Sequence, residues 1–154
     1  MIIETPEYRA FFDRTDGSLG GKFSIRARDG EYLFEKIFVR SGQVGFLHTS
    51  WTQGESPIPF GSYHLNTRPN NRGAIAGAKG IGEAFPIDNQ GDRNTIIDPT
   101  NKRRKRGGIC LHEENAIPGT RGCIAVVYHA DWLRVKDWLH GISDRLVAIP
   151  LEVL

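Results

Sequence analysis

Short segments in which polar and apolar residues alternate dominate the first 65 residues of the chain. Lys22 to Arg28 (Lys-Phe-Ser-Ile-Arg-Ala-Arg) alternates residue by residue, which is the pattern of a half-buried strand. Asp29-Gly30 is a strong turn signal, and a strand-like pattern resumes from Glu31 to Val39. These segments predict a hairpin. Further short strands are expected over residues 43–48 and 62–66.

The remainder of the chain divides into two parts. Residues 67–107 are rich in Gly, Asn, Arg and Pro, and we expect a long irregular insertion there that borders a binding groove. After this segment, regular strands are expected again, over 108–112 and 122–127. Ala130 to His140 has the apolar stripe of a short helix, and residues 145–154 read as a closing strand. The pattern predicts a mostly β, sandwich- or barrel-like fold in a single domain over residues 1–154.

Composition supports a globular protein with many turns. The chain has 154 residues, of which 39% are hydrophobic and 25% charged, with 18 glycines and 8 prolines. The formal net charge of +2 excludes no partner class and gives no general case for nucleic acid. One run, Lys102 to Arg106, is strongly basic, and a solvated loop is its default interpretation.

Two signals for membranes and secretion are missing from the sequence. No window approaches the ~18 apolar residues of a membrane span. The N-terminal residues lack the basic and apolar regions of a signal peptide. We therefore expect a protein that is made in the cytoplasm and reaches the periplasmic or cell-wall face by phage-mediated or secretion-mediated delivery.

Cys123, with His112 eleven positions upstream, is the strongest candidate for chemistry. A cysteine attacks as its thiolate, so it needs a base or a cation beside it. His112 ends one expected strand and Cys123 begins the next, and Arg121 adds a further cation nearby. Gly122 allows close approach of a substrate, and the N–H groups of Gly122 and Cys123 are candidate oxyanion donors. The residues alone leave open a buried Cys123 with an unrelated surface histidine.

The segment from His112 to Thr120-Arg121-Gly122-Cys123-Ile124-Ala125 resembles the L,D-transpeptidase catalytic-domain (YkuD-like) family. That family carries a histidine on one strand, then a loop, then Ser/Thr-His-Gly-Cys. The turn-rich residues 56–63 resemble the family's Pro/Gly turn, and the helix, glycine and final strand fit its ending. Two departures stand out: Arg121 replaces the family's second histidine, and the loop between His112 and Cys123 is short. Both are typical of divergent phage and toxin members.

The resemblance implies a cysteine enzyme that acts on the stem peptides of peptidoglycan through a thioester, without a metal or cofactor. L,D-carboxypeptidase, endopeptidase and L,D-transpeptidase activities all remain open, as does a role as a phage lysin. The candidate catalytic residues are His112, Arg121, Gly122 and Cys123. The candidate substrate-binding residues are Tyr63, Arg68, Glu113, Asn115 and Thr120.

Two other interpretations of the chain remain at this point, together with one question about Cys110. The chain could be a non-catalytic phage structural or cell-wall-binding module that keeps the fold. It could also bind nucleic acid through Lys102 to Arg106. Finally, Cys110 is either a buried thiol outside any disulfide or the partner of Cys123 in a disulfide that silences the enzyme until it is reduced.

Overall fold

The computed structural model describes residues 6–14, 20–42, 51, 56–72, 82–114 and 122–154. Within these ranges the chain forms one helix and a series of strands. The elements are β1 (Tyr8–Arg14), β2 (Gly20–Ala27), β3 (Tyr32–Ser41), β4 (Gly61–Asn66), β5 (Asn70–Arg72), β6 (Gly82–Asp88), β7 (Thr95–Asp98), β8 (Asn101–Gly107), β9 (Cys110–Glu113), β10 (Ile124–Val126), α1 (His129–Ile142) and β11 (Ala148–Val153).

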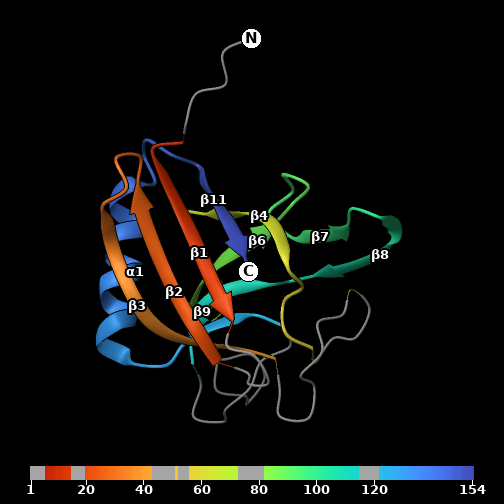
Figure 1. Cartoon of the computed structure of the whole chain (residues 1–154), viewed down its shortest axis with the longest axis horizontal. Coiled ribbons are helices and arrows are strands. Elements are labelled where there is room, and N and C mark those ends of the chain that lie inside the picture. The colour runs from red at the N-terminus through yellow and green to blue at the C-terminus, as the bar shows by residue number, and fades with distance from the viewer. Residues whose placement is uncertain (1–5, 15–19, 43–50, 52–55, 73–81, 115–121) are drawn as a thin grey trace.

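Eight of the strands close into a barrel (Figure 1). The order around it is β4-β11-β1-β2-β3-β10-β9-β6, and the pairing of β6 with β4 closes the ring. Most neighbours are antiparallel, but β1 pairs with β11 and β9 pairs with β10 in parallel. The prediction of a mostly β, barrel-like fold is confirmed. The strand expected over 43–48 lies outside the described residues.

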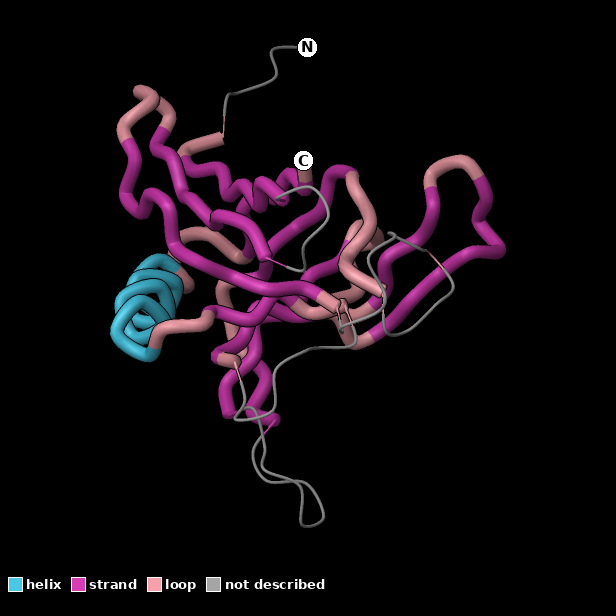
Figure 2. The backbone as a smooth tube through the Cα atoms, turned by 60° about the horizontal axis from the view of Figure 1, so that its bottom comes forward, coloured by secondary structure: helices cyan, strands magenta, loops and turns pink. Residues whose placement is uncertain are grey.

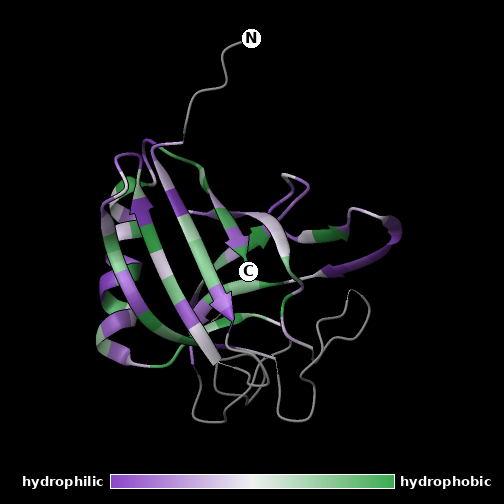
Figure 3. Ribbon diagram, viewed as in Figure 1, coloured by the Kyte–Doolittle hydropathy of each residue, from purple (hydrophilic) through white to green (hydrophobic). Residues whose placement is uncertain are grey.

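The predicted hairpin is present as β2 and β3, and its turn shows why the sequence specifies it. Gly30 has φ +93°, a conformation that glycine adopts without steric cost. The Asp29 carboxylate accepts a hydrogen bond from the Glu31 N–H at 2.9 Å, which fixes the turn locally. Figure 3 shows hydrophobic and hydrophilic residues in turn along these strands, because each strand keeps one face toward the core.

The predicted helix is α1, which extends slightly beyond the expected ends, to His129 and Ile142. Its buried residues are Trp132, Val135, Leu139 and Ile142. The Trp132 ring meets Phe85 of β6 edge-on, with centroids 5.9 Å apart, so the helix packs against the barrel (Figure 2). Among the described residues, no helix is long and apolar enough to cross a bilayer.

The segment 67–107 differs from the irregular insertion that its composition indicated. It contains β5 to β8, and β6 is a barrel strand whose Ala84, Phe85 and Ile87 are fully buried. The Gly- and Pro-rich composition of the segment did not predict this strand. Its hydrogen-bonding partners are β4 and β9, which are not its neighbours in the sequence, so the local pattern contains no sign of the pairing. The β7–β8 hairpin stands out from the barrel (Figure 1) and carries the basic run, which is therefore a strand rather than a loop.

Candidate active site

The parallel pairing of β9 with β10 brings His112 and Cys123 together. Leu111 pairs with Ile124 and His112 with Ala125, so one step earlier in the register Cys123 lies opposite Cys110. Leu111 and Ile124 belong to the hydrophobic core. Because side chains alternate along a strand, His112 and both cysteines share the other face. The structure thus brings the predicted base and nucleophile into one cluster.

The position of the His112 ring identifies the nitrogen that can act as a base. Its Nδ1 lies 2.6 Å from the backbone carbonyl oxygen of Glu113. A carbonyl oxygen only accepts hydrogen bonds, so in the neutral ring Nδ1 carries the proton and donates it there. Nε2 is then the nitrogen with a lone pair. His112 is 4% exposed, so this orientation is held within a nearly closed environment.

Cys123 is surrounded by groups that favour its thiolate. The backbone N–H of Cys110 donates to Cys123 Sγ at 3.3 Å. The Gly108 carbonyl oxygen, 3.6 Å from the same sulfur, accepts from the protonated thiol and does not contribute to this effect. Hydrogen bonding from the Cys110 thiol, and then hydrogen bonding and positive charge from His112, hold the pKa of Cys123 well below its usual value. These effects outweigh burial, which acts in the opposite direction. Cys123 is therefore a candidate nucleophile on geometry and electrostatics together.

Gly122 allows the chain to turn into Cys123, and two side chains fix this turn. Gly122 has φ +96°, and its carbonyl oxygen accepts a hydrogen bond from the Ser41 hydroxyl at 3.1 Å. The same hydroxyl oxygen accepts the Ile58 N–H at 2.9 Å. A Cβ at Gly122 would lie 2.1 Å from Arg106 Nη2, so the guanidinium occupies the space that any larger residue needs.

Arg106 and Ser41 are site residues that the sequence did not reveal. The Arg106 guanidinium donates to the carbonyls of Ser56 and Pro57, at 2.9 and 3.2 Å, and only 8% of the residue is exposed. It joins the turn-rich residues before β4 to the turn at Gly122. The first five residues of β8 are all exposed and Arg106 alone turns inward, so no alternation within the basic run marks it.

The predicted substrate-binding residues lie in different environments in the structure. Tyr63 lies in the core, 3% exposed, where its hydroxyl donates to the Pro59 carbonyl at 2.6 Å, and burial raises its pKa strongly. Arg68 is exposed after the end of β4, and its carbonyl accepts a hydrogen bond from Arg93. The Glu113 carboxylate pairs with His129 rather than His112. Thr120, Asn115 and the catalytic candidate Arg121 lie outside the described residues.

The contribution of Glu113 to the site comes from its backbone. Its carbonyl oxygen orients His112, while its carboxylate meets His129, the first residue of α1. The adjacent Glu114 pairs with Arg40 of β3 at 3.1 Å. The two carboxylates therefore hold β9 to neighbouring elements, and neither orients the imidazole.

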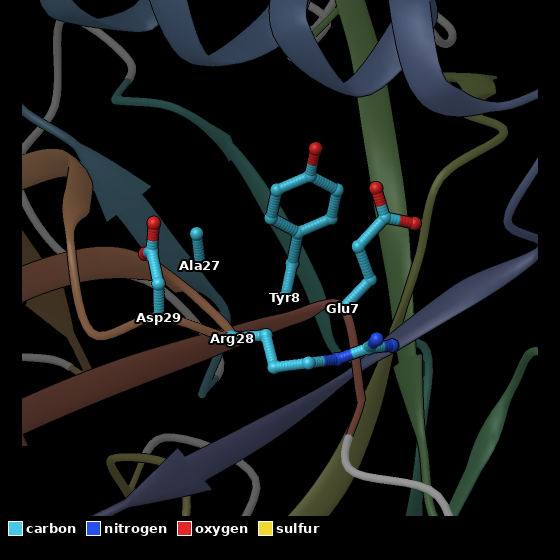
Figure 4. A pocket seen from close by; sticks show the side chains of 5 residues that line it. All are labelled: Glu7, Tyr8, Ala27, Arg28 and Asp29. Atoms are coloured by element: carbon cyan, nitrogen blue, oxygen red, sulfur yellow. The ribbon is translucent and has the colours of Figure 1, made fainter.

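A surface hollow of about 440 Å³ lies elsewhere, lined by Glu7, Tyr8, Ala27, Arg28 and Asp29 (Figure 4). The hollow lies at the end of the β2–β3 hairpin where Ala27 pairs with Tyr8. Cys123 lies near the opposite end of this hairpin, because the next residue, Ile124, pairs with Ser41 at the end of β3. At about 3.3 Å per residue the two places are roughly 30 Å apart along the strands. The hollow is thus separate from the thiol and imidazole. Among the described residues, no cluster of His, Cys, Asp or Glu is arranged to hold a metal ion.

We expect the Cys123 thiol to react with iodoacetamide at a lower pH than an ordinary cysteine. A depressed pKa means that the thiolate is present below the usual value near 8.5, so the rate should rise at a lower pH. His112→Gln removes the imidazolium and should move the midpoint upward. Rates at Cys123 can be measured by peptide mass spectrometry across pH. The exposed His64, replaced by Gln, is the matched control and should leave the profile unchanged.

Comparisons with known proteins add a likeness of fold. No family model matches the chain, and no curated protein matches it by sequence. The solved structures of the helical cell shape determining protein Pgp2 from Campylobacter jejuni and of a mutant of it share its fold, with TM-scores of 0.57 and 0.60. Both are 16% identical to it. The likeness covers 95% and 96% of this chain but 46% and 47% of the Pgp2 chains, so this chain spans about half their length.

Proposed function

We propose that the chain is a cysteine enzyme of the L,D-transpeptidase type, which cleaves or exchanges bonds in the stem peptides of peptidoglycan. The observation that carries this proposal is the pairing of His112 with a Cys123 whose pKa is lowered. A histidine oriented through Nδ1 and hydrogen-bonded to a neighbouring thiol is the arrangement of an activated nucleophile. Perturbed pKa values of this kind cluster at functional sites.

The reaction is an acyl transfer in two halves. His112 Nε2 takes the proton from Cys123 Sγ, and the thiolate attacks the carbonyl carbon of an L-centre such as that of diaminopimelate. The C–N bond of the scissile amide breaks, the departing amine takes the proton from His112, and a thioester forms on Sγ. The N–H groups of Gly122 and Cys123 stabilise the oxyanion.

In the second half of the reaction, the group that attacks the thioester determines whether the outcome is hydrolysis or exchange. Water, losing a proton to His112, attacks the thioester and releases a carboxylic acid; an amine in its place forms a new amide. In both cases Cys123 recovers its thiol. No metal enters either step of this proposal.

The choice of peptidoglycan rests on two supports of different kinds. The sequence from His112 through Thr120-Arg121-Gly122-Cys123 resembles the L,D-transpeptidase motif. The barrel shares its fold with a protein described as determining helical cell shape. The fold alone does not specify a substrate, so the motif carries the assignment.

Digestion of purified sacculi tests this function. Sacculi are incubated with the protein, reduced to muropeptides with a muramidase and analysed by mass spectrometry. Conversion of tetrapeptides into tripeptides indicates L,D-carboxypeptidase action, release of monomers from cross-linked dimers indicates endopeptidase action, and incorporation of an added amino acid indicates exchange. An unchanged muropeptide profile, with a folded protein and a reactive Cys123, would contradict the proposal. Co-sedimentation with sacculi in that case would indicate a wall-binding module.

A further inference from the structure

The two cysteines of the chain are direct neighbours across paired strands. Extending the β9–β10 register by one residue from Leu111 and Ile124 places Cys110 opposite Cys123. Adjacent strands lie about 4.8 Å apart, which is within the roughly 4.4–6.8 Å range of Cα separations in disulfides. Residues paired in this way point to the same face. The backbone is therefore already positioned for a bond between the two sulfurs.

The sulfur atoms converge on one acceptor. Cys110 Sγ lies 3.3 Å and Cys123 Sγ 3.6 Å from the carbonyl oxygen of Gly108. The Cys110 N–H also points at Cys123 Sγ, 3.3 Å away. Both cysteines are reduced in the structure, and together with Ala84 they form a small cluster separate from the main core.

The two thiols differ in how accessible they are to a reagent in solution. Cys123 is 8% exposed, whereas Cys110 is fully buried. The neighbours of Cys123 also favour its thiolate. A small oxidant therefore meets Cys123 first, while Cys110 stays protected as a thiol beside it.

We propose that Cys110 is a resolving cysteine, which converts a peroxide-oxidised Cys123 into a Cys110–Cys123 disulfide and so preserves the nucleophile in a recoverable form. The Cys123 thiolate attacks one oxygen of hydrogen peroxide, the O–O bond breaks, and hydroxide leaves as the sulfenic acid forms. The Cys110 sulfur then attacks Cys123 Sγ, forming the S–S bond. The hydroxyl departs with the Cys110 proton as water.

Reduction completes the cycle. Two equivalents of a small thiol, or one of a dithiol, return both cysteines to thiols and are themselves oxidised to a disulfide. The disulfide removes the nucleophile for as long as it persists. The loss of enzyme activity rests on the proposed function, but formation of the disulfide does not.

Mass spectrometry tests the chemistry directly. The protein is treated with hydrogen peroxide, denatured and alkylated with N-ethylmaleimide. We expect the wild type to lose two hydrogens and both alkylation sites, and dithiothreitol to restore both. Trypsin cuts after Arg121, between the two cysteines, so the disulfide appears as a linked pair of peptides. Non-reducing electrophoresis should show a monomer, because the bond lies within one chain.

Cys110→Ala is the informative variant, since it removes the resolving thiol and leaves Cys123. Under the same treatment its Cys123 should gain two or three oxygens and should not be restored by dithiothreitol. Equal over-oxidation of Cys123 in the wild type and in Cys110→Ala would overturn the proposal. Should Cys110→Ala fail to fold by circular dichroism, the wild type decides alone: a Cys110 that stays alkylatable after Cys123 is oxidised overturns it. Failure to digest sacculi leaves these readouts unaffected.

Discussion

Cys123→Ser is expected to lower the release of muropeptides from sacculi by at least about a thousandfold, because removing the nucleophile of such a unit typically costs 10³ or more. A serine hydroxyl ionises far less readily than a thiol, and the groups that hold down the Cys123 pKa cannot supply the difference. His112→Gln should cause a comparable loss, since Nε2 is then no longer a base. Initial rates measured by chromatography of the digests check both.

Two controls separate lost chemistry from lost structure. Circular dichroism and thermal unfolding should show both variants folded, because each substitution is near in size to the residue that it replaces. Glu113→Gln changes the carboxylate that pairs with His129 but keeps the carbonyl that orients His112, so its activity should remain within a few-fold of wild type. Wild-type rates in Cys123→Ser would refute the assignment of the nucleophile.

Gly122→Ala is expected to lower the free energy of unfolding by about 3 kcal/mol and to abolish activity. The added Cβ would lie 2.1 Å from Arg106 Nη2 and 3.0 Å from Ile109 Cδ1. Arg106 is buried and bonded to the carbonyls of Ser56 and Pro57, so the guanidinium cannot move without breaking those bonds. The φ of +96° adds strain for any residue with a Cβ. Chemical denaturation measures the loss.

Two other glycines provide matched controls. Gly91 has φ +73° with nothing within 4 Å of an added Cβ, so Gly91→Ala isolates the conformational cost, about 1 kcal/mol. Gly141 lies within α1 in open space, so Gly141→Ala should stabilise the protein by about 0.5 kcal/mol through helix propensity. If Gly122→Ala proves no more destabilising than Gly91→Ala, the proposed packing of Arg106 against the turn is wrong.

Local patterns in the sequence predicted the elements that form from their own neighbours. The hairpin of β2 and β3 depends on Asp29 and Gly30, which are adjacent in the chain. The helix α1 depends on a stripe of apolar residues with helical spacing. In both cases the residues that specify the structure lie within about ten positions of each other in the sequence, so a short window contains the information.

The segment 67–107 could not be predicted in this way. Strand β6 takes its hydrogen bonds from β4 and β9, and its apolar residues are buried by elements on both sides of it in sequence. Arg106 likewise looked like one cation of a solvated run. Its burial depends on carbonyls at Ser56 and Pro57, about fifty residues earlier.

By itself the sequence determined the chemistry that is available: a cysteine after a glycine, a histidine upstream, and a second cysteine two residues before that histidine. It also determined the mostly β character, because alternation is a local property. Only the tertiary structure decided how these groups meet. The parallel register of β9 and β10 puts Cys110 opposite Cys123, and the Glu113 carbonyl selects the tautomer of His112. Register and hydrogen bonding between distant strands arise from closure of the whole barrel, and no short stretch of sequence contains them.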